Sequence, residues 1–79
     1  MAGLLERAAD FACVLCAIEG KVATITLNRP ERRNALNYRA YEELEAALRA
    51  ASADEAVRAV IVTGADPAFC SGDDVGEIM

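Results

Sequence analysis

Six consecutive residues late in this chain, Cys70-Ser-Gly-Asp-Asp-Val75, place a glycine and two acids where a predicted strand gives way to a helix. Glycine lets a backbone come close to a ligand, and the first residues of a helix leave unpaired N–H groups that point at it. Such groups suit an oxygen atom that gains negative charge during a reaction. The segment therefore predicts one half of a site that stabilises an oxyanion.

Three arginines, Arg29, Arg32 and Arg33, crowd one turn of a chain that is acidic overall, with 13 acids, 8 bases and a net charge of -5. The overall charge argues against a nucleic-acid partner, because neutralising phosphates requires a basic face. A local cluster can still meet a phosphorylated small molecule, and it can equally be an ordinary solvated turn. Composition leaves both interpretations open.

The chain has three cysteines and no histidine, which limits the metal sites and the nucleophilic catalysis that it could support. Cys13 and Cys16 have the C-x-x-C spacing, but they lie in a predicted strand, where positions three apart face opposite ways. Without a second pair or a histidine, we expect no metal site and a place in the core for both thiols. Because the chain has no histidine, these residues also cannot form a Ser-His or Cys-His catalytic pair.

Length and composition indicate a small globular unit. The chain has 79 residues, of which 54% are apolar and 27% charged. A chain of this length buries only about 60–65% of its extended surface, so we favour a piece of a larger domain. No segment approaches the eighteen or so apolar residues that span a bilayer, and the amino terminus is unlike a signal peptide. We expect no membrane partner and a reduced, cytoplasmic setting.

The hydrophobic period predicts the elements that position these residues. Residues 11–19 and 22–27 are predicted strands joined by a tight turn at Gly20, which makes a hairpin. Pro30 ends the second strand because proline lacks a ladder donor. Residues 1–10 are either a frayed helical turn or disordered, and we treat them as an N-terminal extension.

Beyond the hairpin, an amphipathic helix is predicted over residues 37–51, with Asn34 or Asn37 as its N-cap. Residues 58–63 are apolar and β-branched, which predicts a buried strand, and a further helix follows it. The order β-β-α-β-loop-helix favours an α/β fold in which a crossover helix returns to the same sheet. Four charged residues fall between the apolar positions of the first helix: Glu42, Glu43, Glu45 and Arg49.

Three segments together resemble one known family. They are Val22-Ala-Thr-Ile-Thr-Leu-Asn-Arg-Pro30, Arg33-Asn-Ala-Leu-Asn37, and Ala59-Val-Ile-Val-Thr-Gly64 followed by Ala68-Phe-Cys-Ser-Gly-Asp-Asp-Val75. In this order and spacing they are similar to the N-terminal portion of the crotonase superfamily, the enoyl-CoA hydratases and isomerases. The resemblance covers residues 18–79, a minor part of a family domain. It implies the N-terminal portion of a crotonase-like ββα spiral, with residues 11–79 as an incomplete domain.

The resemblance also implies a coenzyme A site where these motifs meet. In this family the Asn-Ala-Leu-Asn turn lines that site, which places Arg33, Ala35 and Leu36 near the adenine and the phosphates. Ser71 corresponds to a residue whose carbonyl meets the adenine, and Asp73 to one whose backbone N–H is one of two donors to the thioester oxygen. A preorganised donor that polarises this oxygen stabilises an enolate and lowers the barrier by about 3–4 kcal/mol. Further substrate contacts are expected from Gly72, Asp74 and Val75.

The side chain of Asp73 departs from the family pattern, which usually has a small or apolar residue there and an acid only at the position of Asp74. Both carboxylates can simply favour the positive end of a helix, by roughly 0.3–1 kcal/mol each. Alternatively, Asp73 points toward the acyl group and acts as an acid or base, or selects substrate. A negative side chain beside an enolate is unfavourable unless it is protonated or turned away.

As to function, the resemblance implies an acyl-CoA enzyme of fatty acid metabolism with no cofactor besides the coenzyme A thioester, which is the substrate. Hydration of a 2-enoyl-CoA is the default, while isomerisation, thioester hydrolysis and decarboxylation use the same oxyanion hole. The family's catalytic acids lie further along, and Glu77 is better explained as a solvated residue. We therefore predict that the 79 residues alone are inactive. The full-length protein is expected to form a homotrimer or hexamer, and a non-catalytic acyl-CoA-binding or interaction module is the alternative.

Overall fold

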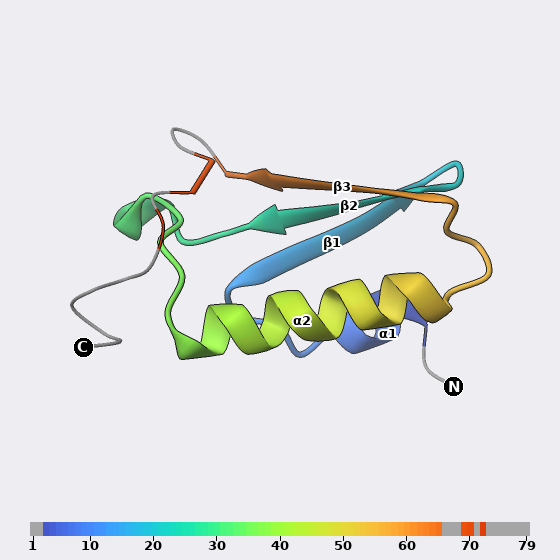
Figure 1. Ribbon diagram of the computed structural model, residues 1–79, viewed down its shortest axis with the longest axis horizontal. Helices are drawn as coiled ribbons and strands as arrows, with labels where there is room; N and C mark the ends of the chain where they lie inside the picture. Colours follow the sequence, from blue (N-terminus) through green and yellow to red (C-terminus); the bar gives the residue numbers. More distant parts are fainter. Residues whose placement is uncertain (1–2, 66–68, 71, 73–79) are drawn as a thin grey trace.

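The computed structural model describes residues 3–65, 69–70 and 72. Figure 1 shows two layers, a sheet of three strands and a pair of helices that lie along one side of it. This is the α/β arrangement predicted from the sequence. In chain order the elements are α1 (Leu4–Ala8), β1 (Val14–Glu19), β2 (Val22–Leu27), the short 3-10 helix η1 (Pro30–Arg32), α2 (Tyr38–Ala53) and β3 (Ala59–Gly64).

The sheet has the order β1-β2-β3. Strands β1 and β2 pair antiparallel, with Cys16 opposite Ile25, and Gly20 turns the chain between them with a φ of 63°. Strand β3 pairs with β2 in parallel, with Ile61 opposite Thr24, so α2 is the crossover connection between them. The predicted hairpin and crossover helix are both confirmed.

The core lies between the sheet and α2. Ala23, Ile25 and Leu27 of β2 are buried on the face that meets the helix, and α2 presents Ala47 there with no exposed surface. Small side chains at such positions let a helix approach a sheet closely. Leu4 of α1 is also fully buried, so residues 4–8 form a packed helical turn, the helical one of the two alternatives.

Glu43 is the clearest departure from the predicted pattern of α2. The hydrophobic pattern places Glu43 among the charged positions between the apolar ones, but it is only 6% exposed. Its carboxylate accepts hydrogen bonds from the N–H groups of Ala12 (2.9 Å) and Cys13 (2.6 Å) and from Arg39 Nε (2.8 Å). These two N–H groups are therefore not available to a strand ladder, and β1 begins at Val14 instead of the predicted residue 11.

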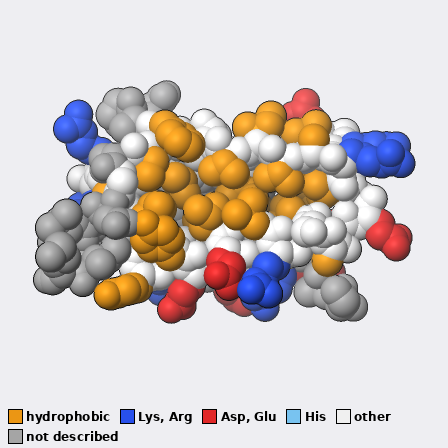
Figure 2. Space-filling model, in the orientation of Figure 1, with side chains coloured by type: hydrophobic (Ala, Val, Ile, Leu, Met, Phe, Trp, Pro, Cys, Tyr) orange, Lys and Arg blue, Asp and Glu red, His pale blue; other side chains and the backbone are white. Residues whose placement is uncertain are grey.

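Strand β3 is not buried, contrary to the prediction. Val60, Ile61 and Val62 are 41%, 53% and 36% exposed. Within the described residues β3 has one strand neighbour, β2, and α2 packs mainly against α1, β2 and β1. Figure 2 shows the result as a band of hydrophobic side chains along this side of the molecule. None of the described helices has the length and apolarity that a bilayer span requires.

Candidate functional site

The turn between β2 and α2 carries the second motif in an unusual backbone conformation. Arg33 and Asn34 have φ angles of 55° and 57°, so two successive residues other than glycine are left-handed. Each such residue costs roughly 1–2 kcal/mol for an ordinary side chain, and asparagine tolerates it best. A turn of this kind persists only where hydrogen bonds hold it in place.

Backbone hydrogen bonds within the turn are joined by those of the Asn34 side chain, and this residue is 1% exposed. Its Oδ1 accepts from the backbone N–H of Arg29 at 2.8 Å, and its Nδ2 donates to the carbonyl of Ala65 at 2.7 Å. Asn34 thus ties the start of the turn to the residue that follows β3. The N-cap of α2 is Asn37, whose Oδ1 accepts from the N–H of Ala40 at 2.8 Å. Of the two predicted caps, only Asn37 has that role.

The arginine cluster divides into one buried and two exposed members. Arg29 is 8% exposed, and its Nη1 donates to the carbonyl of Ala35 at 2.7 Å. Arg32 and Arg33 are exposed. The cluster is therefore not simply a solvated turn, because Arg29 is part of the structure of the turn, and any attraction for phosphate falls to the two exposed arginines.

A backbone hydrogen bond joins the second and third motifs. The backbone N–H of Leu36 donates to the carbonyl of Gly72 at 2.8 Å, across 36 positions of sequence. Gly72 has a φ of 97°, and a Cβ built on it would meet no atom within 4 Å. Glycine is thus required there for its backbone conformation. The N–H of Gly72 donates to Cys70 Sγ at 3.4 Å.

These contacts place part of the predicted site. Ala35 is buried, Leu36 half-buried, and Arg33 and Gly72 are exposed around the same junction. Arg29 and Asn34 hold the junction together, and sequence reasoning did not assign them this role. The sequence signal that points to such a role is an asparagine next to an arginine in a turn that contains proline. Four predicted site residues lie outside the described residues: Ser71, Asp73, Asp74 and Val75.

Cys13 and Cys16 are free thiols that belong to the core or pack against it. Cys13 is buried and Cys16 half-buried, facing the core. Burial, and then the negative charge of Glu43, raise the pKa of the Cys16 thiol, which disfavours the reactive thiolate. Among the described residues no three His, Cys, Asp or Glu side chains come together in a way that could hold a metal ion.

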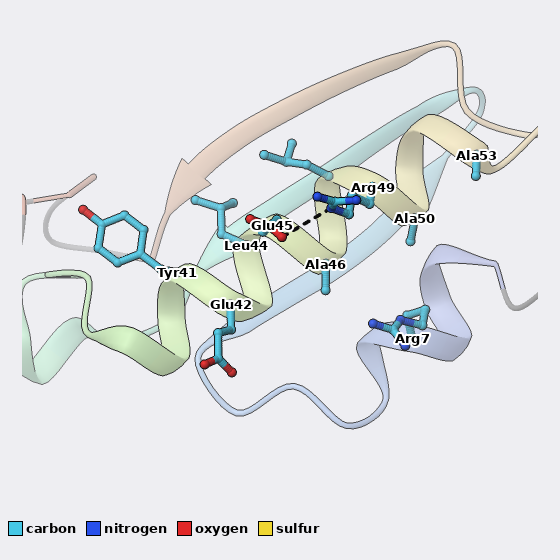
Figure 3. Close-up of a pocket in the computed structure, with 10 residues that line it drawn as sticks. Arg7, Tyr41, Glu42, Leu44, Glu45, Ala46, Arg49, Ala50 and Ala53 are labelled. Carbon is cyan, nitrogen blue, oxygen red and sulfur yellow. Dashed lines mark ion pairs between the residues drawn. The ribbon is translucent and has the colours of Figure 1, made fainter.

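A surface hollow lies elsewhere, lined by residues of α1 and α2. It runs along α2 opposite α1 and is drawn in Figure 3, where Arg7 lies across from the helix and Glu45 pairs with Arg49 at 3.3 Å. Both members of that pair are more than two-thirds exposed. None of the residues around the hollow belongs to the three motifs. The hollow is a shallow helix surface and not the predicted coenzyme A site.

Comparisons with known proteins agree with the motifs. Residues 17–79 match the family model described as enoyl-CoA hydratase/isomerase. A probable enoyl-CoA hydratase of Rhizobium meliloti is 44% identical over 70 residues, which are 89% of this chain and 27% of that protein. The 1,2-epoxyphenylacetyl-CoA isomerase of Escherichia coli is 38% identical over 64 residues, 81% of this chain and 24% of its own length.

The fold comparison gives the same result. The crystal structure of an enoyl-CoA hydratase from Mycobacterium avium superposes with a TM-score of 0.82 at 45% identity, over 85% of this chain and 30% of that one. The chain spans about a quarter of the length of the curated relatives it matches. Since the family model covers most of the sequence, the chain belongs to the enoyl-CoA hydratase/isomerase family, within the crotonase superfamily.

Proposed function

We propose that the complete protein containing this sequence acts on acyl-CoA thioesters by stabilising an enolate in an oxyanion hole, with hydration of a 2-enoyl-CoA as the default reaction. Family membership supports the substrate class. The observation that carries the site is the 2.8 Å hydrogen bond from Leu36 N–H to Gly72 O, because it joins the two motifs expected to bind the substrate.

In this proposal the N–H of Asp73 is one of the two donors to the thioester oxygen. A donor fixed before the reaction costs no reorganisation when charge develops, which makes such groups effective. The backbone supplies it, so the donor does not depend on which side chain stands at position 73. The second donor and the acids that add or remove water are assigned to no residue of this chain.

Coenzyme A would lie along the turn that precedes α2. Arg33 is exposed there and carries the positive charge that a phosphate requires, while Ala35 and Leu36 offer apolar surface beside it. Ser71, Gly72, Asp74 and Val75 complete the proposed contacts. No cofactor is proposed beyond the coenzyme A of the substrate.

The alternative is a non-catalytic acyl-CoA-binding or interaction module. The exposed valines and isoleucine of β3 favour it for the 79 residues taken alone, since an uncovered apolar strand invites a partner. We propose that these residues alone have no turnover, because they supply one wall of a substrate site. A trimer or hexamer and a cytoplasmic location are further proposals for the complete protein.

The test is an assay of the complete protein with crotonyl-CoA and longer 2-enoyl-CoA substrates, following the loss of absorbance of the conjugated thioester. Saturable turnover supports the proposal. Coenzyme A binding by calorimetry without turnover of any thioester favours the binding module. Absence of both binding and turnover refutes the proposed function.

A further inference from the structure

We propose that Asn34 and Arg29 are positioning residues for coenzyme A. They hold the turn that carries Arg33, Ala35 and Leu36 in its binding conformation before the substrate arrives. This inference rests on the proposed function, because that turn is assigned there to the coenzyme A site. Asn34 is 1% exposed and Arg29 8%, so neither side chain offers a surface to the substrate, and both act through the backbone of the turn.

The turn needs such support because two of its residues are left-handed. Arg33 and Asn34 have φ angles of 55° and 57°, a region that side chains other than glycine enter only at a cost in free energy. Without hydrogen bonds to hold it, the segment would return for much of the time to right-handed or extended conformations. A ligand that binds only one conformation has its affinity reduced in proportion to the population of that conformation. The bonds that fix the turn therefore affect how tightly coenzyme A binds.

Asn34 connects the turn to the sheet. Its Oδ1 accepts from the N–H of Arg29 at 2.8 Å, and its Nδ2 donates to the carbonyl of Ala65 at 2.7 Å. The N–H of Ala65 donates in turn to Leu27 O at 2.9 Å, next to the last pair of the β2–β3 ladder. Because Asn34 is almost fully buried, solvent competes weakly with its two side-chain bonds. The sheet thus fixes one side of the turn.

Arg29 supports the other side of the left-handed pair. Its carbonyl accepts from the N–H of Asn34 at 2.8 Å, and its Nη1 donates to the carbonyl of Ala35 at 2.7 Å. The second bond is charge-assisted, which makes it stronger than a bond between neutral groups. One residue therefore binds the backbone of two consecutive turn residues. Arg33 lies directly before them and is exposed, so the same bonds fix the point at which its charged side chain leaves the backbone.

This support should influence binding more than the chemical step. The turn is assigned to the coenzyme A part of the substrate, which is the same before and after the reaction. An interaction that stabilises the ground state and the transition state equally lowers KM and leaves kcat unchanged. Loss of positioning should therefore raise the Kd of coenzyme A and the KM of an acyl-CoA together, and should spare kcat.

The experiment compares Asn34→Gly with wild type in the complete protein, using calorimetry with coenzyme A and kinetics with crotonyl-CoA. Glycine adopts a φ of 57° without a steric cost, so this variant removes the two side-chain bonds and leaves the turn conformation accessible. We expect Kd and KM to rise about 5- to 50-fold, with kcat within about threefold of wild type. Glu43→Gln is the matched control, since it disturbs a buried hydrogen-bonded side chain outside the turn and should leave KM unchanged.

A double-mutant cycle with Arg33→Gln separates positioning from a structural role. If Asn34 acts by placing the charge of Arg33, the loss of affinity in the double variant should be smaller than the product of the two single losses. A loss equal to that product, or a Kd and KM within about twofold of wild type in folded Asn34→Gly, overturns the inference alone. If Asn34→Gly does not fold, the same cycle uses Arg29→Met, with Arg29→Lys expected to recover most of the loss. A wild type that neither binds nor turns over acyl-CoA overturns the proposed function, and this inference with it.

Discussion

Replacing Glu43 by glutamine tests whether a buried carboxylate organises the start of β1. In the folded chain the Cys13 N–H donates to Oε1, while the Ala12 N–H and Arg39 Nε share Oε2. Glutamine has the same shape but only one acceptor oxygen. Its amide is best placed with that oxygen at the shared position, which leaves an NH2 group facing the buried N–H of Cys13.

The expected loss follows from that mismatch. A buried donor without an acceptor costs about 1–3 kcal/mol, and the remaining bonds weaken by about 1 kcal/mol each when the charge is removed. Arg39 is 60% exposed, so its hydrogen bond adds little to the loss. The expected loss of unfolding free energy is therefore about 2–4 kcal/mol. Single substitutions typically cost about 0.5–3 kcal/mol, so this change should be large.

The pH dependence gives a second signature. Burial raises the pKa of Glu43, but the hydrogen bonds from Ala12, Arg39 and Cys13 lower it more, and the net pKa lies below the usual 4.5. A depressed pKa in the folded state means that the stabilisation is present above about pH 4.5 and is lost as the pH falls through the folded pKa. The difference between wild type and Glu43→Gln should therefore shrink in acid.

The assay is urea unfolding of the complete protein, followed by circular dichroism at neutral pH and at several values below pH 4.5. Glu45→Gln is the matched control on the same helix. Its carboxylate is 70% exposed and 3.3 Å from Arg49, so its loss should cost under about 0.5 kcal/mol. Equal midpoints for the two variants, or a Glu43 effect that persists undiminished in acid, would refute the reasoning.

Three further predictions concern the junction and the helix that follows it. Asn37→Ala should cost about 1 kcal/mol of unfolding free energy because the cap to Ala40 is lost, and Asn37→Ser, which can still cap, should stay close to wild type; equal loss in both would contradict this. Gly72→Ala should lower kcat while leaving the protein folded, because a φ of 97° and not crowding excludes a side chain; unchanged kinetics would argue against the junction. Asp73→Ala should keep kcat within about threefold, since the backbone donor survives, and lose roughly 0.3–1 kcal/mol of stability; a tenfold fall in kcat would instead place the carboxylate in the chemistry.

The elements that were predicted well are those that leave a local signal. Strand β2 has its predicted bounds, and α2 is predicted to within two residues at each end, because alternation and the three- and four-residue spacing of apolar residues each lie within a single segment. The periodicity of α2 does not predict the burial of Glu43, because the backbone groups of Ala12 and Cys13 that bind its carboxylate lie 31 and 30 positions away in the sequence. Asn34 was considered only as a cap for the same reason, since its acceptor at Ala65 lies on a different element.

The exposure of β3 shows what an apolar run does and does not establish. Val60, Ile61 and Val62 specify a strand through their shape, and the helical crossover α2 lets β3 return parallel to β2. Burial is a different property, since it depends on what else covers both faces of the sheet. The same distinction applies to the arginines, because charge counted along the sequence does not separate Arg29, whose guanidinium binds a carbonyl inside the turn, from Arg33 at the surface. The hydrophobic pattern of a segment predicts whether it forms a helix or a strand. The role of each residue depends on which residues lie next to it in space.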